Sequence, residues 1–154
     1  MTQTFGSSST TGNELMEYLR YTILLFATAI AGCGNGMSKS DIQSAQSASE
    51  KAAELEKTGA YQEALPLIDS AITMGGLNPD QLAEAYLLRA RCYCVAGKLT
   101  EAEQDLGIAE QGSPNPASWH FSRAILLSKQ GKAAESKAEF AKATRIDPKL
   151  KMPL

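Results

Sequence analysis

Residues 81–114 read QLAEAYLLRARCYCVAGKLTEAEQDLGIAEQGSP and form the clearest helical unit in the sequence. Apolar and small residues recur at helical spacing on both sides of Gly97, and no strand-like alternation of β-branched residues interrupts them. Glycine commonly ends a helix because it adopts a left-handed backbone conformation at no steric cost. The stretch therefore predicts two helices joined by a short turn at Gly97.

Similar units flank this one on both sides. Gly59, Gly97 and Gly131 lie 38 and 34 residues apart, and an Ala-rich amphipathic run follows each of them. Ala90 and Ala124, each preceded by Arg, also lie 34 residues apart. A period of 34 residues is typical of helix-turn-helix repeats. Small side chains at fixed positions would let two neighbouring helices approach closely.

Two Asn-Pro pairs mark the starts of helices. In Asn78-Pro79 and Asn115-Pro116 the asparagine can cap a helix, and the fixed φ of proline suits the first helical turn. With these starts the helical pattern runs, with brief interruptions, from about Asp41 to about Asp147. The pattern predicts an all-α fold.

The repeated units resemble the tetratricopeptide (TPR) repeat. The resemblance covers residues 44–148 as three repeats, 45–79, 81–114 and 117–148, and implies a short α-solenoid of three helix-turn-helix repeats. The third repeat departs from the family pattern with His120 at an aromatic position, and the first is stretched near Gly75. A generic helical bundle of the same size is the alternative. The second repeat carries the family's aromatic, small and closing positions at Tyr86, Ala90, Tyr93, Gly97, Ala102, Leu106, Ala109 and Pro114.

The TPR resemblance implies a binding function without catalysis. Proteins of the family present a concave groove for peptides, lined mainly by the first helix of each repeat. Arg91 would be the one central cation of this groove, placed to meet a carboxylate or a backbone carbonyl. The positions that the resemblance places in the groove are Ser49, Ala53 and Glu56 in the first repeat, Glu84, Leu87, Arg91 and Cys94 in the second, and Ser118, Phe121, Ile125 and Ser128 in the third.

The N-terminal part has the layout of an export signal. Residues 21–31 (YTILLFATAIA) are uncharged and mostly apolar, which is too short for a spanning helix but right for the core of a signal peptide. Ile30-Ala31-Gly32-Cys33 resembles the bacterial lipobox. The resemblance implies that Cys33 is acylated and becomes the first residue after removal of a signal peptide spanning residues 1–32. A plain signal peptide or a short membrane anchor with an incidental cysteine is the alternative.

The residues around the lipobox qualify this prediction. Residues 1–20 carry Glu14, Glu17 and only Arg20, whereas signal peptides open with positive charge; a start at Met16 would bring the segment nearer the expected form. Residues 33–43 are expected to form a flexible linker because GNGMSKS has almost no apolar content. Gly34, and not Asp, follows Cys33, and in enterobacterial-type lipoproteins, which the lipobox resembles, this implies sorting to the outer membrane, facing the periplasm.

Composition excludes several other classes of function. Lys and Arg number 15 against 17 Asp and Glu, so the whole chain has no basic field for nucleic acid. One His and three Cys leave little for a metal site, and no nucleophile elbow or phosphate loop is present. Cys92 and Cys94, about 200° apart around a helix, are expected to be small core residues. His120 has no evident partner and is expected to serve packing. We therefore expect no enzyme, no cofactor and no metal.

Two features near the C-terminus bear on partners. Between Lys129 and Lys151 seven basic residues stand against three acidic ones, which fits a solvated helix face or a contact with an acidic surface. The tail, residues 149–154, is too short to form the helix that normally caps a solenoid. We expect the last helix to leave apolar surface open to a partner or a second copy.

Together these features predict a lipid-anchored scaffold in the bacterial cell envelope. It would recruit or stabilise an envelope complex through its groove. In layout it resembles the pilotins of type IV pilus assembly. The alternatives are an anchored or secreted accessory subunit that binds one enzyme, or a self-associating structural module.

Overall fold

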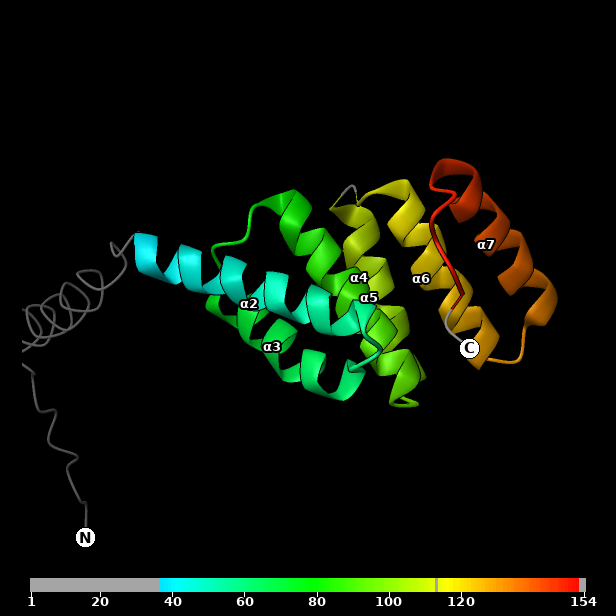
Figure 1. Cartoon of the computed structure of the whole chain (residues 1–154), viewed down its shortest axis with the longest axis horizontal. Coiled ribbons are helices and arrows are strands. Elements are labelled where there is room, and N and C mark those ends of the chain that lie inside the picture. Colours follow the sequence, from blue (N-terminus) through cyan, green and yellow to red (C-terminus); the bar gives the residue numbers. More distant parts are fainter. Residues whose placement is uncertain (1–36, 113, 153–154) are drawn as a thin grey trace, which may run out of the picture. The chain divides into compact units, whose positions relative to one another are not determined.

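The structure is a computed structural model that describes residues 37–112 and 114–152. Six α-helices make up this part, which contains no strand, so the predicted all-α class is confirmed for these residues (Figure 1). The signal peptide and Cys33 lie outside the described residues. The helices are α2 (Lys39–Lys57), α3 (Tyr61–Met74), α4 (Pro79–Val95), α5 (Leu99–Gln111), α6 (Pro116–Lys129) and α7 (Ala133–Ile146).

Each helix packs against the next one in the sequence. The closest associations join α2 with α3, α4 with α5, and α6 with α7, and these three pairs follow one another in Figure 1. Further contacts join α4 to both α2 and α6. Neighbouring pairs are therefore joined in two ways, by α3 with α4 and α5 with α6, and by contacts among α2, α4 and α6.

The core lies in two clusters that share α4. One cluster contains Ile68, Leu88 and Cys92, and the other contains Leu87 and Cys94. Ile68 and Leu87 are fully buried, and burying a side chain of this size contributes about 1.5–3 kcal/mol to the free energy of folding. Alanines fill most remaining core positions, which allows the close helix approach that the sequence predicts.

Local signals place the helix ends as predicted. Asn78 Oδ1 accepts a hydrogen bond from the backbone N–H of Gln81 at 2.8 Å, and Asn115 Oδ1 accepts one from Ala117 at 2.9 Å. Gly97 and Gly131 have φ values of +77° and +76° in the turns after α4 and α6. Both turns need this left-handed conformation, which a residue with a Cβ adopts only at a cost.

The predicted linker was too long. Residues 39–43 belong to the first two turns of α2, whose N-cap is Ser38, and the Ser38 hydroxyl accepts a hydrogen bond from the backbone N–H of Asp41 at 3.1 Å. Met37 then lies against the loop after α3, because a Cβ added to Gly76 would lie 2.7 Å from its sulfur. A serine cap and one apolar contact thus start the helix earlier than composition alone suggests.

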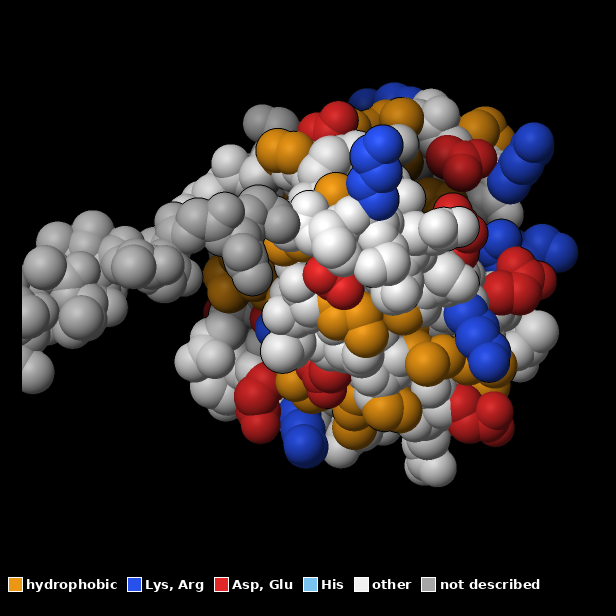
Figure 2. All heavy atoms as spheres, turned by 90° about the vertical axis from the view of Figure 1, so that its left-hand side faces the viewer, with side chains coloured by type: hydrophobic (Ala, Val, Ile, Leu, Met, Phe, Trp, Pro, Cys, Tyr) orange, Lys and Arg blue, Asp and Glu red, His pale blue; other side chains and the backbone are white. Residues whose placement is uncertain are grey.

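The predicted open apolar surface on the last helix was also wrong in extent. Ile146, which is 54% exposed, is the one large hydrophobic side chain of α7 that lies exposed. The outer positions of α7 are otherwise alanines and charged residues such as Lys137 and Lys142. The described surface of α7 therefore carries no large apolar field. Figure 2 views the molecule from the side of Figure 1 that lies away from α7, and on that face hydrophobic side chains lie in separate patches between groups of both charges.

Candidate functional site

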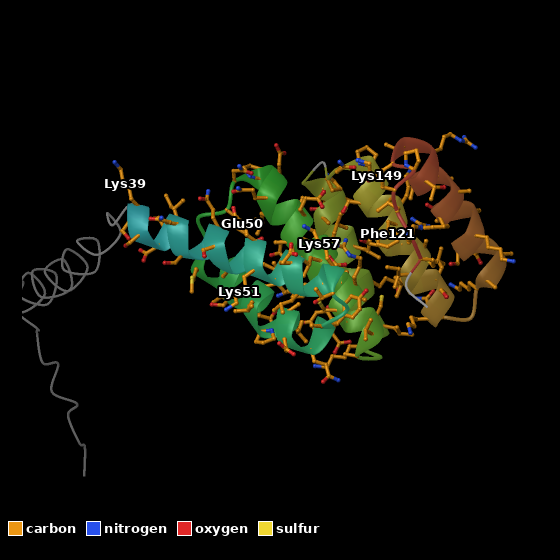
Figure 3. All side chains as sticks on the ribbon, viewed as in Figure 1. Lys39, Glu50, Lys51, Lys57, Phe121 and Lys149 are labelled. Atoms are coloured by element: carbon orange, nitrogen blue, oxygen red, sulfur yellow. The ribbon has the colours of Figure 1, made fainter. Side chains whose placement is uncertain are left out.

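A cavity of about 970 Å³ lies between the end of α2, the helices α4 and α6, and the segment that follows α7. We call it the central cavity. Figure 3 shows Lys57 at the end of α2 and Phe121 on α6, and both side chains line the central cavity. Its wall combines aromatic and aliphatic side chains with carboxylates and cations. A wall of this kind suits a peptide better than a purely apolar ligand.

A buried ion pair forms part of this wall. Arg91 of α4 donates to Glu56 of α2 through Nε and, at 2.7 Å, through Nη2, while its Nη1 donates to the Ser122 hydroxyl of α6 at 2.7 Å. Only 7% of Arg91 is exposed. Burial opposes its charge, but the carboxylate of Glu56 outweighs burial and raises the pKa of Arg91. One guanidinium thus ties three helices together.

A second carboxylate in the wall, Glu84, adds to the charge that raises the pKa of Arg91 but forms no salt bridge with the described residues. Glu84 of α4 accepts hydrogen bonds from the backbone N–H of Asn115 at 3.0 Å and from the Ser118 hydroxyl at 2.7 Å. Both donors lie at the N-terminus of α6, where the helix dipole favours negative charge. Glu84 forms no salt bridge with the described residues, so its charge remains available to a cationic ligand.

Aromatic side chains supply the apolar part of the wall. Phe121 is half-buried, its ring centroid lies 6.2 Å from that of Phe140, and the Arg91 guanidinium lies 6.0 Å from it. Tyr61 of α3 also lines the central cavity, and burial together with the charge of Glu56 raises the pKa of its hydroxyl. These rings offer flat surface to an apolar side chain.

The predicted groove residues divide into two groups. Glu56, Glu84, Arg91, Ser118 and Phe121 line the central cavity together. These five residues come from α2, α4 and α6, which lie far apart in the sequence. Arg91 also has partners within the chain that the sequence did not indicate, because three of its five N–H donors go to Glu56 and Ser122.

The other predicted groove residues lie elsewhere. Leu87, Cys94 and Ile125 are at most 3% exposed and belong to the core cluster, so their placement on an open groove surface was wrong. Ser128 is exposed on α6 but does not line the central cavity. Ser49 and Ala53 are half-buried on α2 and do not line it either.

Several interactions were not predicted because they join residues distant in sequence. Arg89 donates to Asp105 through Nε and Nη2, both at 2.7 Å, and to Asp69 at 2.9 Å, linking α3, α4 and α5. His120 has a partner after all, since its Nδ1 lies 2.6 Å from Glu139 Oε2 on α7. The helical periodicity of α4 and α7 could have suggested inward-facing polar residues, but not which residues pair.

The cysteines of α4 are core residues, as predicted. Cys92 and Cys94 are each 2% exposed and unbonded to one another. Burial raises the pKa of Cys92 to about 12 and that of Cys94 to about 11. Both thiols therefore stay protonated and unreactive at neutral pH.

Over residues 37–112 and 114–152 no group of three or more His, Cys, Asp or Glu side chains is arranged to hold a metal ion. None of the helices described is both long and apolar enough to span a membrane. No family model, curated protein or solved structure matches the chain.

Proposed function

We propose that this chain is a lipid-anchored protein-interaction scaffold of the bacterial cell envelope. Its helical part would be three TPR-like repeats, formed by the pairs α2 with α3, α4 with α5, and α6 with α7. The glycine turns at Gly59, Gly97 and Gly131 support this assignment, because each joins the two helices of a pair and each has a positive φ. The order of helix contacts is compatible with such repeats.

One observation carries the binding function. The central cavity gathers side chains from the first helix of every pair, Glu56 from α2, Glu84 from α4 and Phe121 from α6. A concave site with an aromatic ring and a carboxylate without a paired cation suits a peptide segment that brings both apolar and basic groups. Its partner would be a protein in the envelope.

Photo-crosslinking tests the binding function. We would place p-benzoylphenylalanine at Phe121, in the central cavity, and at Ile108, which is 45% exposed on α5 and does not line the cavity. We expect a discrete crosslinked product in cells from position 121 and none from position 108. Equal products from both positions, or none from 121, would contradict a binding site in the cavity. A product of twice the chain mass would instead indicate self-association.

The membrane anchor is a separate part of the proposal and rests on the lipobox Ile30-Ala31-Gly32-Cys33. Three acyl chains on Cys33 would anchor the chain stably, since one chain binds a membrane only marginally. We expect labelled palmitate to enter the wild-type chain and not the Cys33→Ala variant. Equal labelling of the two chains would exclude acylation at this cysteine, with Cys92→Ala as the matched cysteine control.

A further inference from the structure

The chain turns back on itself after α7. Pro148 cannot continue a helix, and Asp147 closes a turn there: the backbone N–H of Lys149 donates to Asp147 Oδ1 at 3.0 Å, and that of Leu150 donates to its carbonyl oxygen at 3.3 Å. The following residues run back alongside α6, as the red segment of Figure 1 shows. We call residues Lys149–Met152 the C-terminal tail.

The tail forms part of the wall of the central cavity, and its side chains alternate in exposure. Lys149 and Lys151 are exposed, whereas Leu150 and Met152 are half-buried. Both apolar side chains line the central cavity, and Met152 packs against the core cluster that contains Cys94 and Ile125. Alternation with a period of two is the pattern of an extended segment with one face on a surface.

The charge of the cavity suits the lysines of such a segment. Glu56 is neutralised by Arg91, but Glu84 accepts hydrogen bonds only from neutral groups of the described chain. Lys151 also lines the cavity. A lysine of a bound segment can therefore approach an acidic wall while an adjacent apolar side chain meets Phe121.

We propose that the central cavity binds an extended segment of a partner protein in which apolar side chains alternate with lysines, and that the chain's own tail covers part of this site until such a segment displaces it. This deepens the proposed function, on which it rests, by naming the chemistry of the partner segment. The tail is thus both a resident competitor and an example of what the cavity accepts.

A tethered competitor weakens binding by an amount that can be calculated. A segment on a short flexible connection has an effective concentration of about 1 mM. If the free segment has a Kd of about 0.1 mM, the tail reduces the apparent affinity for an external segment about tenfold. Removing the apolar contacts of the tail should therefore raise the apparent affinity for an external segment about tenfold.

The test measures binding of a fluorescein-labelled peptide with the sequence RIDPKLKM, residues 145–152, by fluorescence anisotropy. The proteins are the full wild-type chain and the full chain with Leu150→Asp and Met152→Asp. We expect the double variant to bind the peptide about tenfold more tightly than wild type. A peptide with aspartate at both apolar positions should bind neither protein.

Matched variants control for charge and folding. Lys137→Asp changes the charge by the same two units on the exposed face of α7, and it should bind the peptide as weakly as wild type. Adding Phe121→Ala to the tail variant should abolish binding while circular dichroism shows unchanged helicity. Equal binding to wild type and to the tail variant, or binding to neither, would overturn the proposal.

A second measurement does not depend on any variant of the tail. In wild type carrying ¹³C-methyl methionine, the Met152 methyl resonance should differ from that of free methionine and should shift in Phe121→Ala. A free-methionine position in wild type would overturn the proposal. The proposed scaffold function would survive that result if crosslinking from position 121 still captured a partner, so the two failures are distinguishable.

Discussion

Arg91 shows how one residue can be structural in a place where a binding role was expected. Three of its five N–H donors engage Glu56 of α2 and Ser122 of α6, so a single side chain of α4 connects three helices that line the central cavity. Such a pair is costly to break, because the surviving charge remains buried without a partner. The shape of the central cavity therefore depends on the ion pair of Arg91 with Glu56.

Glu56→Gln should destabilise the chain by about 3–5 kcal/mol, since it leaves the buried guanidinium of Arg91 without its carboxylate. Urea unfolding followed by circular dichroism measures this change. The matched control is Glu54→Gln, two residues away on α2, whose side chain is 70% exposed and whose pair with Lys57 should contribute at most about 1 kcal/mol. A similar loss for both variants would show that the Arg91 pair is not special.

Glu139 gives a prediction about pH. Burial opposes its charge, but hydrogen bonds from Lys142 and His120 outweigh burial and hold the pKa of Glu139 below its ordinary value of 4.5. A carboxyl group whose pKa is lower in the folded than in the unfolded chain stabilises the fold at pH values above its unfolded-state pKa. This contribution disappears as the pH falls through the folded-state pKa.

The wild-type chain should therefore be more stable than Glu139→Gln at pH 7, and the difference should shrink as the pH falls below 4.5. Thermal unfolding at a series of pH values checks this. Glu135→Gln, on the exposed side of the same helix, serves as control and should show no such dependence. A difference that stays constant down to pH 3 would contradict the role of the ionised carboxylate.

At the level of elements, the predictions that succeeded rest on local chemistry. Asn78 and Asn115 cap helices and Gly97 and Gly131 end them because each acts on backbone groups within four residues. The prediction failed where contacts are long-range. Glu56 and Arg91 lie 35 residues apart, and no local pattern indicates that they pair.

The prediction that Leu87, Cys94 and Ile125 line an open groove was wrong for a similar reason. Leu87, Cys94 and Ile125 stand at the expected helix positions, but Met152 and the half-buried Phe121 pack against the core cluster to which they belong. The length of the tail indicated that it was too short to form a capping helix. It could not indicate that Asp147 and Pro148 turn the tail back toward the cavity.

Gly97 and Gly107 provide a matched pair for testing a turn against a helix interior. A Cβ added at either position would meet no atom within 4 Å, so only the backbone differs between them. Gly97→Ala should cost about 1–2 kcal/mol because φ is +77°. Gly107→Ala, inside α5, should stabilise by about 0.5–1 kcal/mol. Urea unfolding of both variants checks the opposite signs, and equal effects would contradict the assigned turn.

For the whole molecule, the question is whether the two core clusters unfold together. Both include residues of α4, with Cys92 in one cluster and Cys94 in the other. Because the same helix completes both cores, opening one cluster exposes surface of the other, and we expect one cooperative transition.

The two buried thiols report this cooperativity directly. In a Cys33→Ala background, Cys92→Ser leaves only Cys94 and Cys94→Ser leaves only Cys92, so each variant reports the opening of one cluster. Both thiols should react with a disulfide reagent only through opening, because burial protonates them and excludes the reagent. We expect the free energy of opening from labelling to equal the free energy of unfolding from urea for each variant. Faster labelling of Cys94 alone, with unchanged global stability, would contradict this expectation. It would show that the cluster of α4, α5 and α6 against which Met152 packs opens by itself. Such local opening is what displacement of the tail would require if it disturbed this cluster.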